Sequence, residues 1–255
     1  MTDLTDDARL AADLVRDAGR LAARMLTDGL SVREKSSVSD VVTAADHRAE
    51  TLITERLASE RPHDAVVGEE GTNRPGTSGR SWVIDPVDGT WNFIRGLTWW
   101  CSAIALCGPD DVLLGAVYHP HDDALFVGGP TLRSTRNGVE LPPLADRSLA
   151  ESCASTYLHP PFYDGLVGAA FVRAVSDAAT LRMMGSGTMD QMALAQGQVD
   201  VVFQHSVPDW DWYPGCAIVR GAGGVARRSS AGGVVWSVSG APTAVAEVCA
   251  ALEEE

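Results

Sequence analysis

The chain has 255 residues, of which 45% are apolar and 21% charged, and this composition is typical of a folded globular protein and not of a disordered one. Its 34 acidic residues outnumber 20 basic ones and give a net charge of −14. This balance argues against a nucleic-acid groove and against a polybasic membrane patch. We therefore expect neither nucleic acid nor a membrane among its partners.

The cysteines and the N-terminus indicate the compartment. The five cysteines have irregular spacing and form no CxxC pair, which argues against a disulfide framework and against a zinc ribbon. The first ten residues are acidic and resemble no secretory signal. No apolar run approaches the roughly 18 residues of a membrane span. We expect a cytoplasmic protein.

The first half of the chain begins with two predicted helices and continues with strands. Residues 5–28 carry leucines at helical spacing and are predicted to form an amphipathic helix. A second helix is predicted over 45–60, because Arg61-Pro62 disfavours its continuation. Asn137-Gly138 predicts a hairpin turn. Apolar runs bounded by turn residues predict strands at 65–68, 82–84, 100–107, 112–118, 125–128 and 131–135.

The second half alternates between strand and helix patterns. Residues 142–147 are polar, contain proline and lack periodicity, so we place a lobe boundary there and divide the chain into 1–145 and 146–255. Beyond it, strands are predicted at 152–157, 181–184 and 199–203, and helices at 171–178, 188–196 and 213–221. This alternation predicts an α/β lobe that follows an α+β N-terminal lobe.

Two aspartates follow a short apolar run directly. Asp85 and Asp88 belong to the segment Asp-Pro-Val-Asp-Gly-Thr, which on its own is a good turn sequence. At the end of a buried strand, such a turn can aim both carboxylates and the Val87 carbonyl into one small volume. Two like charges held together are costly unless one takes a proton or a cation lies between them. Because every candidate ligand atom is an oxygen, the pattern favours Mg²⁺.

More acidic groups are available elsewhere in the chain. Glu69 follows the apolar run 65–67, and Asp211 stands where a helix is expected to begin. Each has an ordinary explanation, since acidic residues stabilise helix N-termini. Together they predict a cation site assembled from distant segments. Thr90 caps a helix in the ordinary interpretation, and in the functional one Gly89 and Thr90 offer N–H groups to a phosphate.

The motif Trp-Val-Ile-Asp-Pro-Val-Asp-Gly-Thr-x-Asn-Phe, present here as residues 82–93, resembles the signature of the inositol monophosphatase superfamily. Three further landmarks of that family stand in the expected order, at residues 40–46, at residues 67–70, and at Trp210-Asp211 with the glycines near 223. The likeness spans residues from about 35 to 225. It implies a layered α/β/α/β/α sandwich, a small phosphorylated metabolite as substrate and a homodimer.

The resemblance also implies residue roles and two or three Mg²⁺ ions. Glu69, Asp85 and the Val87 carbonyl would hold one ion, and Asp85, Asp88 and Asp211 a second, with a third, weaker ion near Glu69. The catalytic residues implied are Asp46, Thr90 and Glu69, with the first two positioning and activating the attacking water. The substrate-binding residues implied are Gly89, Thr90, Gly185, Ser186, Gly187 and Gln204.

Four positions depart from the family pattern. Gln204 stands where a glutamate is frequent, Gly187 replaces alanine, Trp91 is bulkier than usual and Gly221 stands where glutamate is usual. The substrate therefore stays open. A small polyol phosphate such as inositol 1-phosphate is the first hypothesis and histidinol phosphate the second. A catalytically silent binding protein is a third, which the complete set of acidic residues argues against.

Three further features have ordinary interpretations. His205 is expected in a surface loop and not against the substrate. Trp99-Trp100 is expected to pack and not to bind a ligand. The His119-Pro120-His121 segment is expected to form a turn and not a transition-metal site.

Overall fold

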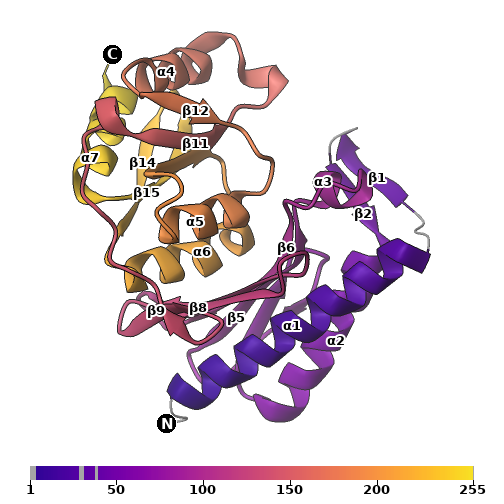
Figure 1. Cartoon of the computed structure of the whole chain (residues 1–255). Helices are drawn as coiled ribbons and strands as arrows, with labels where there is room; N and C mark the ends of the chain where they lie inside the picture. Colours follow the sequence, from indigo (N-terminus) through magenta and orange to yellow (C-terminus); the bar gives the residue numbers. More distant parts are fainter. Residues whose placement is uncertain (1–3, 29–31, 38–39, 255) are drawn as a thin grey trace.

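In the computed structural model, which describes residues 4–28, 32–37 and 40–254, the chain forms five layers. Two helices, α1 and α2, cover one face of an eight-stranded sheet. Helices α5 and α6 lie between that sheet and a five-stranded one, whose far face is covered by α4 and α7 (Figure 1). The layered α/β/α/β/α sandwich expected from the resemblance is thus confirmed.

The first layer pairs α1 (Leu4–Asp28) with α2 (Ala44–Glu60), and both helices lie side by side in Figure 1. Leu10 and Leu14 of α1 and Ile53 of α2 are buried against the sheet. This burial is the main reason the helices form, since an apolar stripe stabilises a helix by packing. Between them, β1 (Val32–Ser37) and β2 (Asp40–Thr43) form an antiparallel ribbon.

The eight-stranded sheet has the order β10-β9-β8-β7-β6-β5-β3-β4. Its only parallel pair among the described strands is β3 with β5, so their C-terminal ends meet at one edge. Its strands are β3 (Ala65–Gly68), β4 (Asn73–Arg74), β5 (Ser81–Asp88), β6 (Cys101–Cys107), β7 (Val112–His119), β8 (Ala124–Gly129), β9 (Leu132–Arg136) and β10 (Val139–Glu140).

The five-stranded sheet has the order β12-β11-β13-β15-β14. Its strands are β11 (Cys153–Tyr157), β12 (Thr180–Arg182), β13 (Val201–His205), β14 (Val225–Ala231) and β15 (Val234–Gly240). The remaining helices are α3 (Thr90–Ile94), α4 (Gly165–Ser176), α5 (Gly187–Ala195), α6 (Asp209–Gly221) and α7 (Pro242–Glu253), with short 3₁₀ turns at Leu149–Glu151 and Pro160–Phe162.

Most predicted elements are confirmed within a few residues, and two differences matter. Helix α6 begins at Asp209 and not at Tyr213, so Asp211 lies in its first turn. Helix α4 begins at Gly165 and not at Phe171. No helix in the described part of the chain combines the length and the apolar character needed to cross a membrane.

The predicted lobe boundary at 145/146 falls between β10 and the turn at Leu149–Glu151, where the chain leaves the first sheet for the second. Helices α5 and α6 belong to the second half of the chain, yet Met192 and Ile218 pack against Ala103 and Val117 of the first sheet. We propose that the chain has two lobes, 1–145 and 146–255, which share this core.

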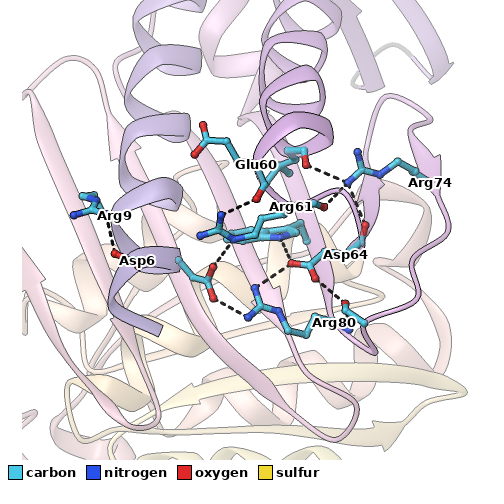
Figure 2. A network of polar contacts seen from close by, with 11 residues as sticks. Asp6, Arg9, Glu60, Arg61, Asp64, Arg74 and Arg80 are labelled. Atoms are coloured by element: carbon cyan, nitrogen blue, oxygen red, sulfur yellow. Dashed lines mark hydrogen bonds and ion pairs between the residues drawn. The ribbon is translucent and has the colours of Figure 1, made fainter. Parts of the chain in front are cut away.

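Buried ion pairs fasten α1 and the end of α2 to the start of β5. Asp7 of α1 accepts from Arg61 Nε at 2.7 Å and pairs with Arg80 Nη1 at 2.8 Å, and Arg80 also pairs with Asp64 at 3.0 Å. Arg74 donates to three backbone carbonyls around the same point (Figure 2). We call Asp7, Arg61, Asp64, Arg74 and Arg80 the Arg–Asp network.

Candidate active site

A cavity of about 480 Å³ opens where the C-terminal ends of β3 and β5 meet the N-termini of α3, α5 and α6. The structure brings together at this point residues from both halves of the chain. Of the predicted site residues, the cavity is lined by Glu69, Asp85, Val87, Asp88, Gly89, Thr90, Gly185, Gly187, Gln204 and Asp211. Asp46 and Ser186 are buried beside these residues. Each is connected to one of them by a hydrogen bond that is described below.

Three carboxylates converge in the cavity. Asp85, Asp88 and Asp211 each offer an oxygen, and these oxygens lie within 4.8 Å of one another. The cause is an irregularity in β5: pairing with β6 is regular up to Asp85 and resumes at Asp88, so Pro86 and Val87 form a bulge. The bulge brings both aspartates of β5 together, and the early start of α6 adds the third.

The carboxylates repel one another. Burial raises the pKa of Asp85 well above its ordinary value, and the charges of Glu69, Asp88 and Asp211 raise it further. Burial also raises the pKa of Asp88, although hydrogen bonds from Thr188 and Ser186 oppose the shift. Such a group must hold protons or a cation. The all-oxygen donor set fits a hard divalent ion such as Mg²⁺ and does not favour zinc or copper.

The Asp88 carboxylate is fixed by the start of α5. Its Oδ2 accepts from Ser186 Oγ at 2.9 Å and from the Thr188 amide at 2.7 Å. Ser186 is the N-cap of α5, and its hydroxyl also accepts from the amide of Met189. The helix N-terminus that donates to this carboxylate therefore belongs to the second half of the chain, whereas Asp88 belongs to the first.

Thr90 and Asp46 form a pair beside the carboxylates. Thr90 Oγ1 lies 3.3 Å from Asp46 Oδ1 and 3.0 Å from the Val87 carbonyl oxygen. Asp46 is fully buried in the first turn of α2, where a capping box with Thr43 holds its other oxygen through the Thr43 amide and hydroxyl. Burial raises the pKa of Asp46, the bonds from Thr43 oppose this, and the charge of Glu69 adds to it.

Gly89 links the carboxylate bulge to Thr90. Its φ of +87° lies in the left-handed region that favours glycine, and it is the N-cap of α3. A Cβ at this position would lie 3.0 Å from both the Ser186 Cβ and the Trp99 carbonyl oxygen. The chain therefore needs a glycine here both for the turn and for the close approach of its neighbours.

Two departures from the family pattern contact each other, and a third lies elsewhere. A Cβ at Gly187 would lie 3.0 Å from Gln204 Oε1, so the missing methyl group leaves room for the amide of Gln204. Gly221 does not line the cavity. A Cβ there would lie 2.4 Å from Ser134 Oγ and 2.6 Å from the Leu132 carbonyl oxygen. Gly221 is therefore a packing requirement between α6 and β9, and using it as an indicator of substrate identity was wrong.

Sequence reasoning missed Glu50, which supports Glu69. The Glu50 carboxylate is buried and accepts from the amides of Glu70 at 2.8 Å and Thr72 at 3.0 Å, so it fixes the turn after β3. A signal existed, because Glu50 follows Asp46 by one helical turn and lies on the same face of α2.

Sequence reasoning also missed most of the remaining residues that line the cavity. They are aromatic, apolar or thioether side chains: Trp91, Leu97, Tyr157, His159, Met183 and Met184. Trp91 lies within the motif of residues 82–93, but no motif marks the others, which come from the end of β11 and from separate loops.

Two features that were set aside differ in outcome. His205 is buried, with its ring packed edge-on against Phe162 and Trp236, so the expectation of a surface loop was wrong. Trp100 packs against Phe93, as expected. Trp99 also packs, against the core between the two sheets and against the His119 ring, and it donates from Nε1 to Asp190 at 2.8 Å.

Comparison with known proteins decides the family. A family model described as the inositol monophosphatase family matches residues 3–253. The chain belongs to this family. Inositol monophosphatase 2 of Rattus norvegicus is 28% identical over 232 residues, covering 88% of this chain and 80% of that protein. The inositol-1-monophosphatase of Rhizobium meliloti is 31% identical over 203 residues, covering 76% and 74%.

Solved structures share the fold. The extragenic suppressor protein SuhB of Bartonella henselae superposes with a TM-score of 0.86 at 25% identity, covering 96% of this chain and 98% of that one. An inositol monophosphatase of Thermotoga maritima gives 0.84 at 24% identity, covering 97% and 96%. The family and its named relatives identify this chain as a phosphoric monoester hydrolase.

Proposed function

We propose that this inositol monophosphatase family member hydrolyses the phosphate ester of a small polyol, such as inositol 1-phosphate, with Mg²⁺ as its cofactor. One observation carries the proposal: the oxygens of Asp85, Asp88 and Asp211 lie within 4.8 Å of one another in the cavity that Thr90 also lines. The names of the relatives support a polyol phosphate as the substrate.

Two or three Mg²⁺ ions would be held by the acidic residues. Glu69, Asp85 and the Val87 carbonyl would hold one, and Asp85, Asp88 and Asp211 another. The raised pKa of Asp85 supports this assignment, because the carboxylates that raise it would be neutralised by a cation. When bound, Mg²⁺ lowers the pKa of a water molecule and neutralises charge on the phosphate and the leaving oxygen.

Thr90 and Asp46 would orient the attacking water. The Thr90 hydroxyl has one hydrogen and two nearby acceptors, Asp46 Oδ1 and the Val87 carbonyl. With that hydrogen donated to either one, Thr90 Oγ1 accepts a hydrogen bond from water and directs the water's lone pair towards phosphorus. The amides of Gly89 and Thr90, at the start of α3, would hold the non-bridging phosphate oxygens. Direct attack by water needs no phospho-enzyme and inverts the configuration at phosphorus.

A second candidate substrate is histidinol phosphate. The observation that favours it is that Trp91, Tyr157, His159 and Met183 line the same cavity as the carboxylates. A flat heterocycle gains from contact with aromatic rings and thioethers. The hydroxyl groups of a polyol would need hydrogen-bond partners among the same side chains.

A phosphate-release assay on a substrate panel tests the proposal. The panel contains inositol 1-phosphate and histidinol phosphate, each with Mg²⁺ and with EDTA. We expect release with Mg²⁺ alone, and we expect inositol 1-phosphate to have the higher kcat/KM. A higher value for histidinol phosphate would favour the second candidate. A folded protein that releases phosphate from no ester at any Mg²⁺ concentration would make the chain a silent binding homologue.

We also propose a cytoplasmic homodimer. The strand β12 is at one edge of its sheet, and the apolar side chains of Leu181 and Met183 are exposed there. All five cysteines are free, which suits a reducing compartment. Light scattering on the purified protein tests the assembly, and a monomeric mass at micromolar concentration would contradict it.

A further inference from the structure

A ring of hydrogen bonds joins the two halves of the chain beside the cavity, which Asn92 and Met184 of the ring also line. The side-chain amide of Asn92 in α3 donates to the Trp99 carbonyl at 2.8 Å and to the Met184 carbonyl at 2.7 Å. The Trp99 indole donates to Asp190 in α5 at 2.8 Å. The backbone from Met184 to Asp190 closes the ring.

The segment that closes the ring is the one that holds Asp88. Ser186 and Thr188 lie between Met184 and Asp190, and both donate to Asp88 Oδ2. The Met184 carbonyl is hydrogen-bonded to Asn92 of α3, and the Asp190 carboxylate is hydrogen-bonded to Trp99. Both ends of this segment are therefore fixed relative to the bulge of β5. A change in either bond moves the two donors relative to Asp88.

The ring is tightly packed. A Cβ on Gly185 would lie 3.1 Å from the side-chain nitrogen of Asn92, and Gly185 has a φ of +88°. A Cβ on Gly89 would meet the Trp99 carbonyl oxygen at 3.0 Å. Two glycines therefore allow α3, the Trp99 segment and the start of α5 to approach closely, and the space leaves little room for an alternative arrangement.

Burial of the Asp190 carboxylate at this point lowers the stability of the fold. It is fully buried, and its second oxygen accepts from Ser155 Oγ at 2.8 Å. Burial raises the pKa of Asp190 to about 7, the bonds from Trp99 and Ser155 oppose the shift, and the charge of Asp88 adds to it. A buried carboxylate costs stability compared with an apolar residue of similar size, and this cost favours a role beyond packing.

We propose that Asn92, Trp99 and Asp190 are positioning residues that set the orientation of Asp88 through Ser186 and Thr188, and thereby the affinity of the site for its divalent cation. The inference deepens the proposed function and rests on its assignment of Asp88 as a metal ligand. None of the three residues need contact the reacting atoms.

A matched pair of tryptophan variants tests the proposal. Trp99→Phe removes the indole donor to Asp190, and Trp82→Phe removes a donor to another buried aspartate, Asp64, at 3.0 Å in the Arg–Asp network. We measure Mn²⁺ affinity by isothermal titration calorimetry and stability by urea unfolding. Residues that hold metal ligands in place typically change metal affinity by about 10- to 100-fold. We expect such a loss for Trp99→Phe and unchanged affinity for Trp82→Phe, with both variants less stable.

Equal Mn²⁺ affinity in the two variants and the wild type would overturn the proposal and leave the ring a structural feature only. If Trp99→Phe does not fold, Asp190→Asn and Asp190→Ala replace it. The asparagine keeps an oxygen that accepts from Trp99, so we expect it to retain more Mn²⁺ affinity than the alanine. Equal affinity in those two variants and the wild type would also overturn the proposal.

Calorimetry separates this inference from the proposed function. A wild-type protein that binds Mn²⁺ and releases no phosphate contradicts the proposed hydrolysis, while the affinity ratios still decide the ring. A wild-type protein that hydrolyses the ester, with Trp99→Phe needing no more Mg²⁺ for half-maximal activity, contradicts the ring alone. In an active enzyme we expect Trp99→Phe to raise that Mg²⁺ requirement about tenfold and to change the KM for the ester less.

Discussion

Buried carboxylates lie at both ends of β5, but the charged groups around them have opposite signs at the two ends. Where the strand begins, Asp7 pairs with Arg61 and Arg80. Arg80 also pairs with Asp64 (Figure 2). Burial alone would raise the pKa of Asp64, but bonds from neighbouring groups and the charge of Arg80 leave it below its ordinary value. At this end of β5, arginine side chains of the protein neutralise the buried carboxylates.

Where β5 ends, the charges that act on Asp85 are carboxylates. Glu69, Asp88 and Asp211 all raise its pKa. The same residue type, buried at both ends, is thus neutralised at one end and left with repulsion at the other. The difference supports the proposal that the second end binds a cation from outside the chain, since such binding would offset the cost of the repulsion.

Substitution of Asp88 should give the largest effect. Asp88→Asn removes a charge that would hold a metal ion, and we expect kcat/KM to fall about a thousandfold, or about 4 kcal/mol of transition-state stabilisation. In EDTA the same change should raise the free energy of unfolding, because it relieves repulsion with Asp85 and Glu69. Phosphate release and urea unfolding measure both. Wild-type activity in the variant would remove Asp88 from the metal site.

The matching substitution at the other end should act on stability. Asp7→Asn weakens the pairs with Arg61 and Arg80, and breaking a buried pair from one side costs about 3 kcal/mol or more. We expect a lower free energy of unfolding by about that amount, with kcat/KM per folded molecule unchanged. A stabilising effect of Asp7→Asn in EDTA would mean that the two ends do not differ as described.

Both helices of the first layer and the carboxylate-bearing segment at the end of β5 were predictable from local sequence. The leucine spacing of 5–28 predicts α1 directly, and Asp85 and Asp88 are adjacent to the apolar run that forms β5. The last strands and helix were not predicted. Strand β14, Val-Ala-Arg-Arg-Ser-Ser-Ala, is a half-exposed edge strand without alternation, and four of the twelve residues of α7 are alanines, which weakens the contrast between its apolar and polar faces. Neither has a strong periodic signal.

The supporting groups of the site were less accessible to sequence reasoning than its carboxylates. Asp190 contacts Trp99 across 91 residues of chain, and Asn92 contacts Met184 across 92. No local pattern encodes such pairs, because they exist only once the two sheets enclose α5. The carboxylates are adjacent to strand ends and turn residues, which local sequence does mark.

Mg²⁺ should stabilise the protein through the carboxylates at the C-terminal end of β5 and not through those at its start. For the wild type, saturating Mg²⁺ at about 100 times its Kd should raise the free energy of unfolding by about 2.7 kcal/mol. Asp211→Asn should abolish most of that gain, because Asp211 supplies one of the converging oxygens. Asp7→Asn should keep it in full. Thermal unfolding with Mg²⁺ and with EDTA measures the difference, and an equal gain in Asp211→Asn would exclude Asp211 as a ligand.

The smallest expected effect is a difference in pH slope between two buried aspartates that each accept a hydrogen bond from a tryptophan, Asp64 and Asp190. The pKa of Asp190 is raised to about 7, so its contribution to stability is complete below the unfolded-state pKa of about 3.9 and is lost as the pH rises through about 7. The pKa of Asp64 is lowered, so its contribution is present above about 3.9 and is lost as the pH falls through the lowered value.

Each aspartate is compared with its asparagine variant by urea unfolding in EDTA. As the pH rises from about 4.5 to 7, the stability of Asp190→Asn relative to wild type should rise, with a slope of up to about 1.4 kcal/mol per pH unit. Over the same interval the stability of Asp64→Asn relative to wild type should stay nearly constant, because Asp64 is already ionised in both states. It should rise only as the pH falls below about 4. Parallel slopes for the two variants would show that Asp64 and Asp190 are stabilised alike in the folded state, and the opposite pKa shifts described for these two aspartates would then be wrong.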